Sequence, residues 1–173
     1  KRSTDAGVSW SEDTSLSFNA LWPSIAVQGS TIHIVYFGGN SEITYKRSTD
    51  AGESWEEEIQ LSSSNSVYPS TPSISISGSV VHVVWVDSRD GNDEIYYKRS
   101  TDAGLIWEAD TRLTNNSFGS YFPSIAVSNS DVHIIWMDYP GSGDYDIYYM
   151  HSSDAGLSWG TDTRLTNNPS FSS

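Results

Sequence analysis

The chain of 173 residues has no cysteine and only 9 lysine and arginine residues, against 22 aspartate and glutamate residues. The missing cysteines exclude disulfides and thiolate metal sites. The formal net charge of −13 disfavours nucleic-acid backbones and anionic membrane surfaces as partners. No apolar run approaches the length of a membrane span, and these residues contain no cationic-then-apolar signal segment. The composition is compatible with a secreted protein, and we expect an extracellular location.

The feature that dominates the chain is an internal repeat. The pattern Ser-x-Asp-Ala-Gly-x-x-Trp, here called the box, occurs at residues 3–10, 48–55, 100–107 and 152–159. The boxes start at positions 3, 48, 100 and 152, which gives a period of 45 to 52 residues. A period of this size is typical of the blades of a β-propeller.

Each period contains four short segments with strand character, separated by turns. In the last period we expect strands over residues 124–127, 132–137, 146–151 and about 157–165. No window shows a sustained 3.6-residue period, so no helix is predicted. The second strand is apolar on both faces, as a sheet packed on both sides requires. The predicted fold is all-β, with propeller blades of four antiparallel strands.

The repeats are expected to form a single domain over residues 1–173. Its predicted parts are a partial N-terminal blade over 1–17 and complete blades over 18–66, 67–117 and 118–173. About three complete blades are fewer than the roughly four to eight that close a propeller. Open apolar blade faces are unfavourable in water. We therefore expect either association with another copy, as a homo-oligomer such as a dimer with about six blades, or a place within a longer polypeptide.

The residue types of the box suit a tight turn between the third and fourth strands. Its Asp can accept hydrogen bonds from amides of the same turn, and its Gly suits a positive φ. Its Trp is expected to bury its ring between adjacent sheets. A lone Asp in each turn has no second carboxylate beside it for metal binding or acid–base chemistry, which favours a structural role. The predicted structural residues are Asp5, Gly7, Trp10, Asp50, Gly52, Trp55, Asp102, Gly104, Trp107, Asp154, Gly156 and Trp159.

This pattern resembles the Asp-box, also called the bacterial neuraminidase repeat (BNR), of sialidases and related β-propellers. One departure is Ile106, where the family pattern has Ser or Thr. For a sialidase, the resemblance implies three arginines that grip a carboxylate, a Tyr/Glu nucleophile pair and an Asp acid, all outside the boxes. The family's Arg-Ile-Pro segment is absent, and only Arg89 among the six arginines lacks a repeat counterpart. We assign no catalytic residue; any activity would be that of an exo-sialidase-like glycoside hydrolase.

A ligand site is expected on the face that carries the loops between second and third strands and the linkers between blades. These segments vary between repeats and contain aromatic and acidic residues, which suit sugar binding through CH–π stacking and hydrogen bonds to hydroxyl groups. Three aromatic residues next to prolines, Trp22, Tyr68 and Phe122, are instead expected to pack at blade junctions. The predicted ligand-binding residues are Arg89, Asp87, Asp90, Phe118, Tyr121 and Tyr139, all except Asp87 expected to be exposed.

Metal binding has little support in the sequence. Asp87, Asp90 and Asp93 supply oxygen ligands for Ca²⁺ but miss the EF-hand spacing, and Arg89 lies among them. The recurrence of His33, His82 and His133 at one strand position favours a framework role over zinc binding. We predict no cofactor, with calcium at the three aspartates as the open alternative.

Three functions remain compatible with these observations, because a fold does not determine a function. The first is a non-catalytic propeller module that binds carbohydrate or protein. The second is part of a sialidase-like glycoside hydrolase whose catalytic residues lie largely outside this chain. The third is a repeat scaffold without a ligand of its own.

Overall fold

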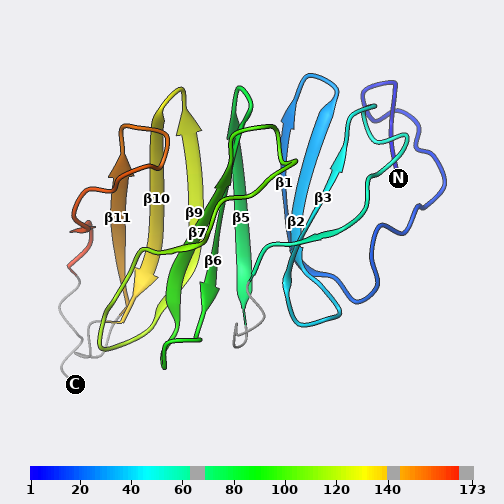
Figure 1. Ribbon diagram of the computed structural model, residues 1–173. Coiled ribbons are helices and arrows are strands. Elements are labelled where there is room, and N and C mark those ends of the chain that lie inside the picture. The colour runs from blue at the N-terminus through cyan, green and yellow to red at the C-terminus, as the bar shows by residue number, and fades with distance from the viewer. Residues whose placement is uncertain (63–68, 140–144, 168–173) are drawn as a thin grey trace.

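The computed structural model describes residues 1–62, 69–139 and 145–167. In that part of the chain it contains twelve β-strands and no helix (Figure 1). The strands form three antiparallel sheets of four, each made of strands that are consecutive in the sequence. The predicted all-β fold of four-stranded blades is therefore confirmed. The described residues contain no helix that is long and apolar enough to cross a membrane.

Each sheet is one blade, and the three blades share one pattern of strand lengths. Blade A has β1 (Leu21–Gln28), β2 (Thr31–Phe37), β3 (Ile43–Ser48) and β4 (Ile59–Gln60). Blade B has β5 (Ser70–Ser77), β6 (Val80–Asp87), β7 (Glu94–Ser100) and β8 (Thr111–Arg112). Blade C has β9 (Ser120–Ser128), β10 (Asp131–Asp138), β11 (Asp146–Ser152) and β12 (Thr163–Arg164). The fourth strand is shorter than predicted, because residues 153–158 are turn and bend.

The first strands of the blades lie next to one another, with β5 between β1 and β9 (Figure 1). Blade B therefore separates blade A from blade C, and β4, β8 and β12 lie at the far edges of their sheets. None of the three sheets closes on itself. This is the arrangement of an open, partial propeller, as the repeat pattern predicts. The boundary predicted at residues 66 and 67 lies outside the described residues.

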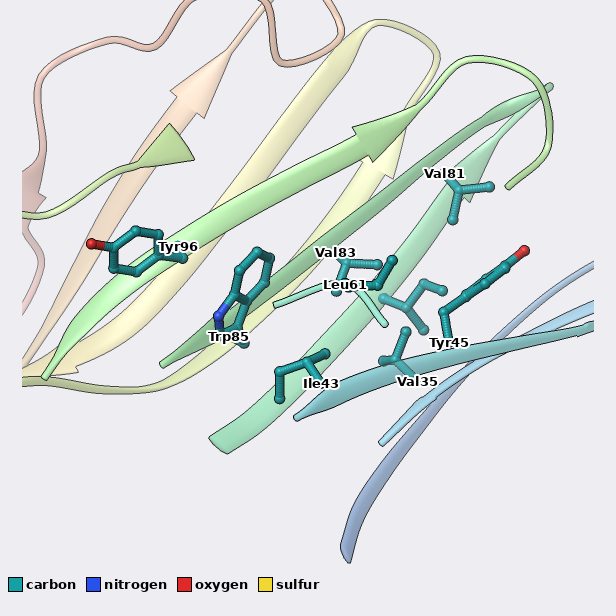
Figure 2. Packing of buried hydrophobic residues seen from close by; sticks show 9 residues of the cluster. Val35, Ile43, Tyr45, Leu61, Val81, Val83, Trp85 and Tyr96 are labelled. Carbon is teal, nitrogen blue, oxygen red and sulfur yellow. The ribbon is translucent and has the colours of Figure 1, made fainter. Parts of the chain in front are cut away.

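The hydrophobic core lies between the blades, because the side chains of a strand alternate between the two faces of its sheet. On β6, Val83 and Trp85 pack against blade A, whereas Val84 and Val86 pack against blade C. Figure 2 shows the first of these clusters, in which Val35, Ile43, Tyr45 and Leu61 of blade A meet Val81, Val83, Trp85 and Tyr96 of blade B. The apolar character of both faces of the second strand is thus explained by packing on both sides.

A β-bulge interrupts each first strand just before its proline. The residue that precedes the proline has a positive φ in all three blades: 49° at Trp22, 47° at Thr71 and 51° at Phe122. The strand register shifts at this point, between Leu21 and Ser24 in blade A. Positive φ is uncommon for bulky residues, and bulges of this kind redirect a side chain. Trp, Thr and Phe therefore share one backbone conformation at the same place in successive blades.

Residues 1–17 contain no strand, yet they contact blade A as the end of a preceding blade would. Lys46 donates to the carbonyl oxygen of Leu16 at 3.1 Å, just as Lys98 of blade B donates to that of Leu61 at 2.7 Å. Arg2 pairs with Glu53 at 2.8 Å. A cavity of about 530 Å³ remains between this segment and blade A, lined in part by Ile25. The segment thus covers only part of the outer face of blade A.

Candidate ligand-binding face

The loops of the blades are sorted onto two opposite faces. On one face, the boxes of the three blades contact the turn between the first and second strands: Ala51, Ala103 and Ala155 donate to Ser30, Ser79 and Ser130 at 2.8 Å. On the other face, the loops between second and third strands contact the linkers between blades. The backbone amide of Ser120 donates to Asp93, and that of Tyr139 donates to Gly119. The loops predicted to bind a ligand and the boxes therefore lie at opposite ends of the strands.

Each box is closed by its own side chains. In the first box, Gly7 donates to Ser3 Oγ at 2.7 Å, and Ser9 donates its amide and hydroxyl to Asp5 at 2.9 and 2.5 Å. The Ser9 hydroxyl, followed by its amide and the Ser3 hydroxyl, lowers the pKa of Asp5 to about 2. The third box lacks the second hydroxyl, because Ile106 offers only its amide to Asp102. The box carboxylates thus serve the turns that contain them.

The boxes also join adjacent blades through a tyrosine, here called the receiving tyrosine. Tyr45 of blade A packs edge-on against Trp107 with ring centroids 4.9 Å apart, and Tyr97 of blade B packs in the same way against Trp159. A Cβ atom added at Gly104 would lie 2.0 Å from the Tyr45 hydroxyl oxygen. The glycine therefore has two reasons to be there, its φ of 86° and the approach of the tyrosine.

The repeated histidines hold these tyrosines. The Nδ1 atoms of His33 and His82 lie 2.6 and 2.7 Å from the hydroxyl oxygens of Tyr45 and Tyr97. Burial lowers the pKa of both His33 and His82 to about 4, and burial raises the pKa of the two tyrosines. Nowhere in the described chain do three or more His, Cys, Asp or Glu residues form a group that could hold a metal ion.

Arg89, in the loop between β6 and β7 of blade B, was predicted to be exposed, but its side chain is largely buried. The Arg89 side chain is only 10% exposed; it pairs with Asp87 at 2.6 Å and with Asp110, and its guanidinium lies 4.1 Å from the centre of the Tyr96 ring. Asp87 is completely buried and also accepts from the Trp85 indole at 3.3 Å. The expectation that Arg89 is exposed is therefore wrong, because its charge is neutralised inside blade B.

The three aspartates considered for calcium lie in separate environments. Asp87 faces Arg89, whereas Asp90 accepts from the Tyr96 hydroxyl and from Arg112 at 3.1 Å. Asp93 lies against the Tyr121 hydroxyl. Asp90 is exposed, as predicted. Two of the three carboxylates face arginines, and the three belong to no group in the described chain that could hold a metal ion.

The predicted aromatic residues do come together, in what we call the aromatic cluster. Phe118 packs edge-on against Tyr139 with centroids 5.5 Å apart, Tyr139 lies 5.4 Å from Tyr145, and Tyr145 lies 5.9 Å from Tyr121. Phe118 is 45% exposed and Tyr145 is 51% exposed. Sequence reasoning missed Tyr145, although an aromatic residue beside the variable loop of blade C was a usable signal. The linker before β9 and the start of that strand, together with the loop between β10 and β11, thus build one patch of aromatic rings.

A groove of about 340 Å³ runs across the bulges of the three first strands, next to the aromatic cluster. It is lined by the positive-φ residues Trp22, Thr71 and Phe122 and by Pro23, Ser24, Pro72, Ser73 and Pro123. Trp22 and Phe122, predicted to pack at blade junctions, are instead 48% and 61% exposed and line this open groove. Tyr68 lies outside the described residues. Phe122 joins the groove to the cluster, because its ring lies 6.5 Å from that of Tyr121.

The buried carboxylates near this face are engaged in the framework. Burial is the main cause of the raised pKa of Asp138, which accepts from the indole of Trp136 and from Asn116. Glu94 accepts from Thr114 at 2.5 Å and from Arg112 at 2.7 Å. Glu94 and Asp138 are both at most 3% exposed. Neither is placed to exchange a proton with a ligand on the surface.

Comparisons with known proteins support the fold but establish neither a family nor a function. No family model and no curated protein matches the chain. A protein of unknown function from Dyadobacter fermentans matches with a TM-score of 0.64 and 13% identity, covering 82% of this chain and 53% of its own length. The endosialidase of phage phi92 matches with 0.61 and 14%, covering 82% and 26%. A Hadza microbial sialidase matches with 0.60 and 16%, covering 91% and 38%.

These matches support the fold alone: propeller-like blades of four antiparallel strands. The chain spans about half of the first of these structures and smaller shares of the two sialidases. At such low identity the likeness concerns the arrangement of strands and does not extend to chemistry.

Proposed function

We propose that this chain is an exported, non-catalytic propeller module that binds carbohydrate on the face formed by the groove and the aromatic cluster. The observation that carries the proposal is the cluster itself, in which Phe118, Tyr121, Tyr139 and Tyr145 stay in ring contact while remaining partly open to solvent. Membership of the Asp-box family is part of the same proposal and rests on the four boxes.

Aromatic rings of this kind suit the apolar faces of sugar rings. A pyranose presents its C–H bonds on one face and its hydroxyl groups around the edge, so it can stack on a ring and still form hydrogen bonds. The Tyr139 and Tyr145 hydroxyls and the exposed Asp90 supply polar groups on the same side of the molecule. The groove beside the cluster is long enough to extend across three blades.

The charges favour a neutral sugar over an anionic one. Each of the six arginines already pairs with a carboxylate, so none is left to grip a carboxylate on a ligand. The pairs are Arg2–Glu53, Arg47–Glu56, Arg89–Asp87, Arg99–Glu108, Arg112–Glu94 and Arg164–Asp146. The net charge of −13 adds a general repulsion of anions. The same pairs weigh against the alternative that this chain contributes a sialidase site.

A glycan-binding screen tests the proposal. Wild-type protein is presented with neutral and sialylated oligosaccharides, with and without added calcium, and hits are titrated by calorimetry. We expect binding to neutral glycans, unchanged by calcium, and about tenfold weaker binding after Phe118→Ala or Tyr139→Ala because one stacking surface is lost.

The matched control is Leu157→Ala, which removes an apolar side chain that is 71% exposed on the box face and should leave binding unchanged. A flat signal across all glycans would contradict the proposal. Binding that survives both aromatic substitutions would move the site away from the cluster. Binding restricted to sialylated glycans would contradict the preference for neutral sugars.

A further inference from the structure

The two closed junctions of the molecule use one and the same contact. At the junction of blades A and B, the box at 100–107 brings Gly104 and Trp107 onto Tyr45, and Arg47 donates to the Ala103 carbonyl at 2.7 Å. The junction of blades B and C repeats every part of this contact, with the box at 152–159 on Tyr97 and with Arg99 donating to Ala155 at 2.7 Å. A junction thus consists of a receiving tyrosine and an incoming box.

Blade C carries the receiving half of such a junction without a box of this chain on it. Its tyrosine at the repeated position is Tyr149, whose hydroxyl oxygen lies 2.8 Å from His133 Nδ1, as in the closed junctions. The rings of these two residues are stacked. Around it, Ile135 is 44% exposed and Leu165 is 57% exposed. The tyrosine is therefore already held in the orientation that receives a box in blades A and B.

The first box is the matching half, fully formed but not docked on a tyrosine. Its internal hydrogen bonds and its φ values of 57° at Ala6 and 88° at Gly7 are those of the docked boxes. Among the described residues, the ring of Trp10 at 3.8 Å is the sole neighbour within 4 Å of a Cβ added at Gly7, whereas a tyrosine lies within 2.0 Å of one added at Gly104 or Gly156. Trp10 is 61% exposed. The first box therefore has the conformation of a docked box, but no receiving tyrosine of the described residues lies over its glycine.

We propose that the first box of one copy docks on Tyr149 of a second copy, so that the chains associate head to tail. Tyr149 would lie over Gly7 of the second copy, and Trp10 of that copy would pack edge-on against the tyrosine. The two surfaces are different patches of the same chain, which makes the interface heterologous and allows a ring or an open array. Residues 1–17 need not leave blade A for this contact, because their box faces outward. The proposal is independent of glycan binding.

Two substitutions are expected to make this junction weaker than the closed ones. His151 occupies the position of Arg47 and Arg99; it pairs with Asp131 at 2.9 Å and stacks on His133 with centroids 4.8 Å apart. The glutamate that braces each arginine, Glu56 or Glu108, is replaced by Gly160. An imidazole is shorter than a guanidinium and offers fewer donors to the carbonyl of an incoming box. Association should therefore be reversible and concentration-dependent.

Sedimentation equilibrium over a range of protein concentrations tests the proposal. The wild-type protein should exceed the 19.1 kDa mass of one chain as its concentration rises. Gly7→Ala, which places a methyl group where the tyrosine must lie, and Tyr149→Ala should each weaken association by about tenfold or more. The control for backbone strain is Gly29→Ala, because Gly29 also has a positive φ but has nothing within 4 Å of an added Cβ. It should associate like the wild type.

A mixture separates a head-to-tail contact from other modes of association. Each variant has one intact half, the tyrosine in Gly7→Ala and the box in Tyr149→Ala, so an equimolar mixture should form a dimer that neither forms alone. The double variant His151→Arg/Gly160→Glu should associate about tenfold more tightly, because it restores the arginine and its glutamate. A wild-type protein that stays at one chain mass, or a mixture that stays monomeric, would overturn the proposal and leave this face to another part of a longer chain.

Discussion

The closed junctions and the open face of blade C share a histidine-held tyrosine and differ most in the presence of a box. In both places a histidine holds a tyrosine, at 2.7 Å for His82 and Tyr97 and at 2.8 Å for His133 and Tyr149. Where a box is present, Trp159 and the carbonyl of Ala155 complete the contact. Where it is absent, the neighbouring apolar side chain Ile135 is exposed. The box is therefore a connector between blades as much as a turn within one.

The largest expected effect is the loss of folding stability when a docked box, rather than the undocked first box, is substituted at its glycine. Gly156→Ala should destabilise the fold by about 3 kcal/mol, because the new methyl group would overlap the Tyr97 hydroxyl at 2.0 Å and the φ of 81° adds strain. Gly7→Ala has the same backbone strain without the overlap and should cost about 1 kcal/mol. Urea unfolding of the two variants measures the difference. Equal costs would mean that φ alone explains the glycine.

A second expected effect concerns pH and separates the junction histidines from the boxes. His33 and His82 have folded pKa values of about 4, below the usual 6.5, because burial disfavours their charged form. Their contribution to stability is therefore complete above pH 6.5 and is lost as the pH falls toward 4. The box residue Asp5, with a pKa of about 2, contributes above pH 4 and loses its contribution only at lower pH.

Denaturant unfolding at a series of pH values reports both ranges. His82→Gln should flatten the slope between pH 6.5 and 4 and leave the slope below pH 4 as it is in the wild type. The idea that junction burial keeps this histidine neutral fails if the upper slope is unchanged.

The smallest expected effect is the change in thermal stability from one side-chain hydrogen bond, which is present in one docked box and absent from the other. The box at 152–159 has a Ser158 hydroxyl bonded to Asp154 at 2.6 Å, whereas the box at 100–107 has Ile106, which is 73% exposed. Ile106→Ser should restore that hydrogen bond and raise the midpoint of thermal unfolding by about 2 °C. Ser158→Ala should lower it by a similar amount. Calorimetry of both variants checks the pair, and opposite signs to those expected would show that the exposed Ile106 contributes through contacts of its own.

Much of the architecture could be predicted from the sequence because repetition amplifies weak local signals. The four boxes set the period, and the doubly apolar run at Val83 to Val86 required sheets on both sides, as the two core clusters show. The predicted aromatic residues Phe118, Tyr121 and Tyr139 do gather on one face. Each of these predictions depended on a pattern that recurs or on strand alternation.

The wrong predictions concern side chains whose surroundings depend on tertiary contacts or on an unusual backbone conformation, which no repeat pattern indicates. Arg89 appeared exposed because it lies in a variable loop, but its partner Asp110 is 21 residues further along the chain. Trp22 and Phe122 appeared to be junction residues because they precede prolines that open a strand. Their positive φ turns them outward instead, a conformation that sequence propensity disfavours for large side chains.

The bulge before each proline has a consequence for how such a protein can change. Trp22, Thr71 and Phe122 have φ values within a few degrees of one another. The backbone conformation at this position is therefore the same for three different side chains. The side chain at this position can therefore vary while the strand keeps its conformation. Because all three side chains line one groove, substitutions at these positions would change the surface of the groove and leave the pairing of the strands behind it unchanged.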